Sequence, residues 1–299
     1  MKSKVMILLL AGLMVIGSLS GCGFASNDEA ETAAQEEEES ITIEAEANEY
    51  YEAGCVYLYG MNGMEVDFES AYTNFEKAAE LGNASAMTNI GYMYDYGYGV
   101  EQDYAAAVEW YEKAADLGEE IAMYNTGYMY YYGNGVEQDY TVAMKWYEKA
   151  ADLGNTDAMT NIGWMYDNGY GVEEDYALAM EWYLKAAELG NANAMANIGY
   201  FYDYGYGVEQ DYTLAMEWYL KAAELGNTYV MANIGNMYFN GYGVEQDYSL
   251  AMEWYLKAAE LGDANAMNYI AYMYDFGLGV EQDSERASEW YEKAANLGN

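Results

Sequence analysis

Residues 84–119 read ASAMTNIGYMYDYGYGVEQDYAAAVEWYEKAADLGE, and most of the chain after them repeats this stretch. Glycine recurs every 36 residues from Gly82 to Gly298, and tryptophan recurs at the same interval from Trp110 to Trp290. A fixed period of about 20 to 50 residues is typical of a solenoid, in which similar units stack on one another. The sequence therefore predicts an array of short, nearly identical units.

Each unit shows helical periodicity twice. The first helix is predicted over residues 86–96, with Asn83 as its N-cap and Gly97 at its end. The second is predicted over residues 104–117 and begins after Asp103, another good N-cap residue. On this second helix a glutamate precedes a lysine by four residues in most units, which predicts exposed ion pairs of about 0.3 to 0.5 kcal/mol each. The unit is therefore a helical hairpin, and the fold class is all-α.

The consensus of these units, A-x-x-N-I-G-x-M-Y-x-x-G-x-G-V-E-Q-D-Y-x-x-A-x-x-W-Y-x-K-A-A-x-L-G, resembles the Sel-one-like repeat (SLR), a relative of the tetratricopeptide repeat. The family usually has proline where this chain has Glu101 and its counterparts. The resemblance implies an α/α solenoid, a right-handed superhelix of about seven helical hairpins, that is used for protein–protein interaction. It also implies that an asparagine of the first helix lines a groove on the concave side.

Three segments of different composition are expected along the chain. Residues 1–22 have two lysines, an apolar run and a terminal Leu-Ser-Gly-Cys, which resembles a bacterial lipoprotein signal with Cys22 as the lipid attachment site. The alternatives are an ordinary signal peptide and a retained membrane helix, for which the apolar run is short. Residues 23–47 are acidic and poor in bulky apolar side chains, so we expect a disordered tether. Residues 48–299 form the repeat array, with units at 48–83, 84–119, 120–155, 156–191, 192–227, 228–263 and 264–299.

The two end units depart from the pattern. The first is degenerate, with one extra residue in its loop and Asn74 in place of the tryptophan. In the last, Arg286 and Ser288 replace apolar residues that would face a following unit, which predicts that the array ends there.

The composition argues against catalysis. The chain has 51 acidic residues, 11 basic residues and no histidine, for a net charge of −40. Without histidine, the usual catalytic triads and histidine-containing metal sites are excluded. No nucleotide-binding fingerprint is present, and the glycine-rich loop lacks the ligand spacing of an EF-hand. We therefore expect a non-enzymatic protein without cofactor or metal. Its charge would repel nucleic acid and favour a basic partner, although solubility alone explains it equally well.

The candidate ligand-binding residues lie on the predicted first helices. One position holds a ladder of asparagines, whose amides can both donate and accept hydrogen bonds: Asn89, Asn125, Asn161, Asn197 and Asn233. Beside them at helical spacing stand aromatic residues that would give a large contact area: Tyr92, Tyr128, Trp164, Tyr200, Tyr96, Tyr132 and Tyr204. The alternative is structural: the asparagines bond within the array, and the tyrosines pack between units. Cys55 is expected to be a partly packed thiol.

The function that these patterns favour is an interaction scaffold. It would be anchored by lipid at the outer face of a bacterial membrane and would bind a peptide or protein, probably basic, in its groove. The membrane would be contacted through the N-terminal lipid alone. A cell-wall or carbohydrate binder that uses exposed tyrosine and tryptophan is the alternative, and an inhibitor of exported enzymes is a further one.

Overall fold

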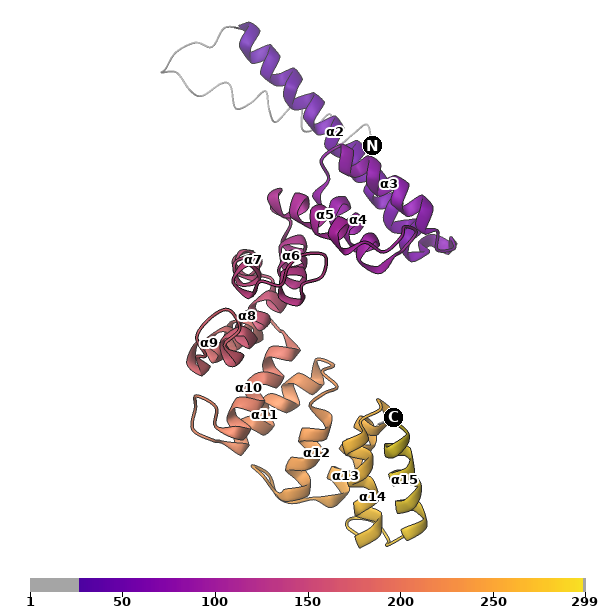
Figure 1. The fold of residues 1–299 in the computed structure, drawn as a ribbon, viewed down its shortest axis with the longest axis vertical. Helices are drawn as coiled ribbons and strands as arrows, with labels where there is room; N and C mark the ends of the chain where they lie inside the picture. Colours follow the sequence, from indigo (N-terminus) through magenta and orange to yellow (C-terminus); the bar gives the residue numbers. More distant parts are fainter. Residues whose placement is uncertain (1–26, 298–299) are drawn as a thin grey trace.

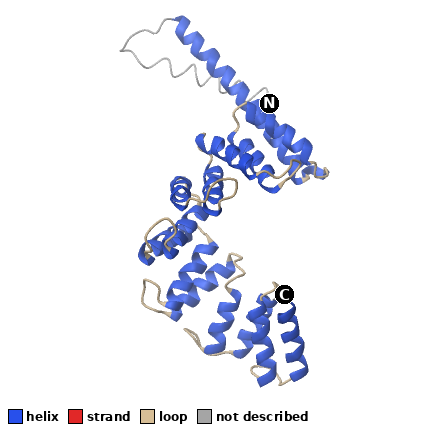
Figure 2. Cartoon of the chain, viewed as in Figure 1, coloured by secondary structure: helices blue, strands red, loops and turns tan. Residues whose placement is uncertain are grey.

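The computed structural model describes residues 27–297, and within them it contains fourteen α-helices, one 3-10 helix and no strand (Figures 1 and 2). The helices form seven consecutive antiparallel pairs, which confirms the predicted all-α solenoid. The pairs are α2 (Asn27–Tyr59) with α3 (Phe68–Glu80), α4 (Ala84–Tyr96) with α5 (Tyr104–Asp116), α6 (Glu120–Tyr132) with α7 (Tyr140–Asp152), α8 (Thr156–Asn168) with α9 (Tyr176–Glu188), α10 (Ala192–Tyr204) with α11 (Tyr212–Glu224), α12 (Met231–Asn240) with α13 (Tyr248–Glu260), and α14 (Ala264–Phe276) with α15 (Ser284–Leu297).

The pairs stack along a curved path from α2 to α15 (Figure 1). We call the first helix of each pair helix A and the second helix B, and we number the units 0 to 6 from α2–α3 to α14–α15. In Figure 1 the B helices α7 and α9 lie on the outer side of the bend, and the A helices α6 and α8 lie on its inner side. The A helices therefore supply the inner surface of this part of the array.

Helix boundaries follow the caps that the sequence predicts. Asn83 accepts a hydrogen bond from the backbone N–H of Ala86 at 2.8 Å, and Asp103 accepts two from the start of α5. Gly97 ends α4 with φ of 71°, a left-handed conformation that glycine adopts without steric cost. The interval between capping residues thus sets the length of each helix.

The core of a unit is a tyrosine on helix B packed against a glycine on helix A. Tyr111 is 1% exposed, and a Cβ atom added at Gly91 would lie 2.7 Å from its ring. The absence of a side chain at this glycine is what allows the two helices to approach. Ala86 and Ile90, which are fully buried, complete the contact, as predicted from their helical spacing.

Neighbouring units are tied together at the N-caps of the A helices. The Asn191 side chain caps α10 and also donates hydrogen bonds to Thr156 and Asp157 of the preceding unit, at 3.1 and 2.8 Å. Asn227 likewise donates to Asn193 at 2.8 Å. One buried residue therefore begins a helix and fixes it to the unit before it.

The acidic segment that precedes the array is not the disordered tether that the sequence predicted. Helix α2 begins at Asn27 and continues into unit 0, so residues 27–47 are helical. The prediction considered only that this segment cannot bury apolar surface. Its many glutamate and alanine residues are strong helix formers, and they extend a helix that is already anchored at Ala47, which is 3% exposed.

The expected glutamate–lysine ion pairs are also not formed in the described part of the chain. Each of these lysines instead places its ammonium over the tryptophan three residues earlier, at 4.3 Å from the ring centroid for Lys113 and 3.7 Å for Lys149. The tryptophan face competes successfully for the cation because the long lysine stem also packs on the ring. The full set is Lys113, Lys149, Lys185, Lys221, Lys257 and Lys293.

Unit 5 departs from the others at the start of its A helix. Val230, which is 2% exposed, occupies a position where other units have a fully buried alanine such as Ala194. The larger, β-branched side chain does not fit the same contact, and α12 begins only at Met231. The backbone before it is a turn in which Tyr229 is 86% exposed.

The predicted signal segment 1–22, its lipid-bearing Cys22 and residues 23–26 lie outside the described residues. Among residues 27–297, no helix combines the length and the apolarity that crossing a bilayer requires. Cys55 is a free, half-buried thiol, as expected, and burial raises its pKa.

Candidate functional site

The predicted aromatic residues form a repeated exposed surface on the A helices, which we call the tyrosine face. Its most exposed members, Tyr96, Tyr132 and Tyr204, show 55 to 57% of their surface. Their partners one turn earlier on the same helix are less exposed. The complete set is Tyr92, Tyr96, Tyr128, Tyr132, Trp164, Tyr200 and Tyr204.

Within a unit the rings of the tyrosine face contact one another. The ring centroids of Tyr92 and Tyr96 are 4.4 Å apart, and those of Tyr200 and Tyr204 are 4.5 Å apart. Trp164 donates from its indole nitrogen to the hydroxyl of Tyr131 in the preceding unit, at 3.2 Å. These rings are thus held in place by their neighbours while one side stays in contact with solvent, a combination that suits a binding surface.

The asparagine ladder lies half-buried at the junctions between units. Burial raises the pKa of Tyr51 to about 12, and a hydrogen bond from Asn89 opposes that rise. Asn161 acts in the same way on Tyr147 of the preceding unit, and Asn233 acts on Tyr219. These three amides therefore bond to tyrosines of the neighbouring unit, so they have a structural role whether or not they also meet a ligand.

Carboxylates lie beneath the tyrosine face in several units. Asp95 accepts a hydrogen bond from Tyr111 at 3.4 Å, and Asp203 accepts one from Tyr219 at 3.2 Å. Burial raises the pKa of both carboxyl groups, and the tyrosine hydrogen bonds partly offset it. In unit 3 the corresponding Tyr183 hydroxyl is buried without a hydrogen-bond partner.

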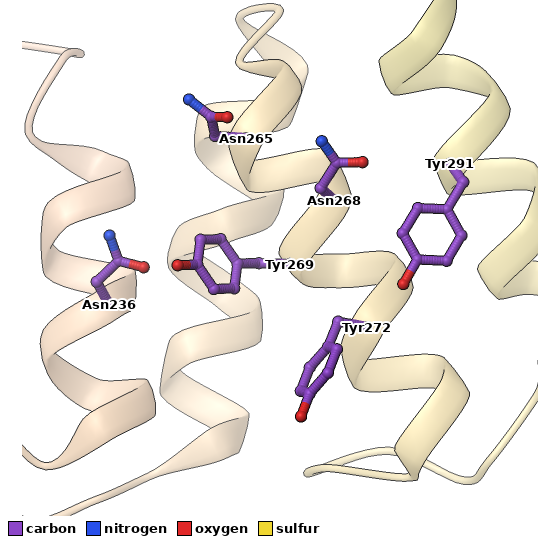
Figure 3. Close-up of a pocket in the computed structure, with 6 residues that line it drawn as sticks. All are labelled: Asn236, Asn265, Asn268, Tyr269, Tyr272 and Tyr291. Carbon is purple, nitrogen blue, oxygen red and sulfur yellow. The ribbon is translucent and has the colours of Figure 1, made fainter.

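A groove opens over units 4 to 6. One hollow of about 250 Å³ is lined by residues of α10, α12 and α14, among them Tyr204, Asn233 and Asn236. A second, of about 470 Å³, continues from it and is lined by Asn236, Asn265, Asn268, Tyr269, Tyr272 and Tyr291 (Figure 3). Because Asn236 and Tyr269 line both hollows, the two form one groove across three units.

The structure brings only two of the predicted site residues, Tyr204 and Asn233, into this groove. The prediction missed Asn236 and Tyr272 because it followed only positions that are identical from unit to unit. The missed signal was the departure from the repeat: asparagine at position 236, where other units have an aromatic ring. Tyr291 was missed because its counterparts, such as Tyr255, are fully buried, whereas it is 40% exposed.

The groove holds no constellation for catalysis or metal binding. Its lining consists mainly of tyrosine and asparagine, and among the described residues no group of three histidine, cysteine or carboxylate side chains could hold a metal ion. The arrangement offers flat aromatic contact together with amide hydrogen bonds, which are means of recognition.

Comparison with known proteins identifies the repeat. The Sel1 repeat model matches residues 50–83, 84–119, 121–155, 156–191, 192–227, 228–263 and 264–299. No curated protein matches the chain.

Solved structures with the same fold have also been found. A protective antigen of uropathogenic Escherichia coli strains that displays an SLR fold is 38% identical, with a TM-score of 0.76 over 90% of this chain, which spans 56% of that antigen. A Sel1 repeat protein from Oxalobacter formigenes is also 38% identical, with a TM-score of 0.75 over 82% of this chain and 99% of its own. An immunity protein from Pseudomonas aeruginosa, at 22% identity and a TM-score of 0.50 over 73% of this chain and 82% of its own, shares the fold alone.

Proposed function

Since the chain belongs to the Sel1 repeat family, whose members are generally non-enzymatic protein-interaction scaffolds, we propose that it binds a protein partner through its tyrosine face. The observation that carries this proposal is the row of exposed rings on successive A helices, at 55 to 57% exposure in three units. Tyrosine provides large contact area and a hydrogen-bonding hydroxyl at low entropic cost, so such rings are favourable in protein interfaces.

The charge of the chain supports a partner with basic character. With a net charge of −40, the scaffold attracts positively charged proteins over a distance set by the ionic strength. This attraction would speed association and would weaken as salt is added. The rings would supply the close contacts once the partner has docked.

Photo-crosslinking tests the face directly. A photoreactive amino acid at position 132, on the tyrosine face, should attach a discrete protein from exported and membrane fractions. The same group at exposed Glu181 on helix B should not. Tyr96→Ala combined with Tyr132→Ala should abolish the crosslink without unfolding the chain. Equal crosslinking from both positions would contradict a dedicated face.

The asparagine ladder requires a separate test because its amides also bond within the array. Asn161→Ala with Asn197→Ala is expected to abolish partner capture if the ladder contacts the ligand. Unchanged capture by a folded double variant, with native circular dichroism, would assign these asparagines a structural role only.

We also propose that the protein is a lipoprotein on the extracytoplasmic face of a bacterial membrane. The proposal is supported by the sequence of residues 1–22, which ends in Leu-Ser-Gly-Cys. Cells fed a labelled fatty acid should label the wild-type chain and not Cys22→Ser. Absence of label from the wild-type chain would contradict the anchor.

A further inference from the structure

Unit 5 carries substitutions that open the groove. Asn236 stands where the other regular units have an aromatic ring, such as Tyr200 or Tyr272. Asn240 stands four residues later on the same helix, where units 1, 2 and 4 have tyrosine. Each replacement exchanges a ring for a short amide, and the helix on which both lie forms the floor of the groove. The hollows thus occur where the repeat changes.

The two asparagines present complementary hydrogen-bonding groups. The side-chain oxygen of Asn236 accepts a hydrogen bond from the Tyr255 hydroxyl at 2.7 Å, so its amide nitrogen remains as a donor. Asn240 donates from its amide nitrogen to the backbone oxygen of Asn236 at 2.8 Å, so its side-chain oxygen remains as an acceptor. A donor and an acceptor therefore stand one helical turn apart on the groove floor.

This pair matches a peptide main chain. Four residues of helix rise by about 6 Å, close to the roughly 6.6 Å after which an extended chain presents the same edge again. A C=O group of the ligand could accept from Asn236 while an N–H group donates to Asn240. No charged group on the ligand is needed for either bond.

The walls of the groove are aromatic and almost uncharged. Tyr212 and Tyr242 stack at 4.7 Å on one side, and Tyr269 and Tyr272 lie on the other (Figure 3). Asp203 is the one charged residue among those that line the two hollows, and it already accepts a hydrogen bond from Tyr219. The lining thus contrasts with the chain as a whole, whose net charge is −40.

We propose that the groove of units 4 to 6 binds an extended, uncharged peptide segment whose main-chain amide is held between Asn236 and Asn240. The proposal deepens the proposed function, on which it rests, by naming the part of the array and the chemistry of the segment. Any basic surface on the partner would then act outside this groove.

A display library of random short peptides, panned on the full chain, tests this inference. Enriched peptides should be uncharged at their common positions, and their affinity should change little with salt. Asn236→Tyr with Asn240→Tyr restores the rings that other units carry and should leave the fold intact while lowering affinity by about tenfold or more. Asn236→Asp keeps the acceptor for Tyr255 but removes the donor, and it should weaken binding as well.

Asn168→Asp is the matched control. Asn168 occupies the position of Asn240 in unit 3 and makes the same bond to the backbone four residues earlier, at 2.9 Å, outside the groove. This variant should bind the enriched peptides as the wild type does. Equal loss in the control and in Asn236→Asp would overturn the assignment.

Three further outcomes would overturn the proposal. One is enrichment of basic peptides whose binding is lost with salt, and another is binding of soluble N-acetylglucosamine oligomers in place of peptides. The third is peptide binding that survives Asn236→Tyr with Asn240→Tyr but is lost in Tyr96→Ala with Tyr132→Ala. That third result would leave the proposed function standing and remove only the groove, whereas loss of the crosslink at position 132 alone would remove the tyrosine face.

Discussion

At the scale of single residues, the array depends on a repeated contact between glycine and tyrosine. In units 1 to 5 a helix A glycine faces the buried helix B tyrosine so closely that an added Cβ would lie 2.6 to 2.7 Å from the ring. Unit 6 has Ala271 at this position, and its Tyr291 is 40% exposed and lines the groove. A single methyl group at this contact thus accompanies a displaced ring.

Gly163→Ala should therefore destabilise the array. The new methyl would lie 2.6 Å from the Tyr183 ring, so we expect a loss of about 1 to 3 kcal/mol in the free energy of unfolding, the usual range for overpacking a core. Urea unfolding followed by circular dichroism would measure the loss. As a control, Ala271→Gly should cost only about 0.5 to 1 kcal/mol, from backbone entropy. A neutral or stabilising Gly163→Ala would contradict the packing argument.

At the scale of the helices, the N-cap asparagines combine two functions that can be separated. Asn155 caps α8 by accepting from the N–H of Ala158 at 2.7 Å, whereas Asn191 caps α10 and also donates to the preceding unit. Removal of a cap alone costs about 1 kcal/mol. The second function adds to that cost because it leaves buried partners unsatisfied.

Asn191→Ala is expected to lower the free energy of unfolding by about 2 to 3 kcal/mol, and Asn155→Ala by about 1 kcal/mol. Both values can be taken from urea titrations of the same chain. The difference between the variants measures the bonds between units. Equal losses would show that these bonds add nothing to the cap.

The late start of α12 gives a further prediction about an element. Val230→Ala should let the first turn of α12 wind as it does in α10, because the buried position again holds a methyl group. The amide protons of Ala232 and Asn233 should then exchange more slowly with deuterium, and helical ellipticity should rise. Unchanged exchange would mean that Thr228 and Tyr229, and not Val230, keep this turn open.

The helices and the register of the units could be predicted from the sequence because their determinants are local. Caps such as Asn83 and Asp103, and the spacing of Ala86 and Ile90, act within one or two turns. The late start of α12 could not be predicted in this way, because the space available to Val230 depends on the packed neighbour. The preference of lysine for tryptophan over glutamate also became visible only in three dimensions.

The candidate site was predictable in outline but not in detail. The tyrosine face follows from helical spacing, and its rings are exposed as a binding surface requires. The groove does not, because a strict ladder draws attention to the positions that never change. Asn236, which interrupts the pattern, needed the neighbouring Tyr269 and Tyr272 in space before its meaning was clear.

At the scale of the whole molecule, the excess of negative charge opposes compaction. A net charge of −40 on a chain of 299 residues produces self-repulsion that salt screens within about 10 Å at 0.1 M. Only one ion pair, between Arg286 and Asp283 at 3.4 Å, is present within residues 27–297. Little attraction between opposite charges is therefore available to be lost when salt is added.

The melting temperature should consequently rise with sodium chloride, by several degrees between low ionic strength and about 0.5 M, as repulsion is screened. Differential scanning calorimetry would record the shift. Sodium chloride is preferred to sulfate because sulfate also strengthens apolar burial. A melting temperature that falls with salt would show that attractive pairs outweigh the repulsion.

The lysines that lie over tryptophan rings also mark the array for proteolysis. Trypsin cleaves after lysine, and one such lysine stands in every regular unit at an interval of 36 residues, from Lys113 to Lys293. Each bond is protected as long as its helix stays wound and its side chain stays on the ring. Brief digestion would therefore give fragments that differ by whole repeats, and the first fragment to appear would identify the unit that opens most readily.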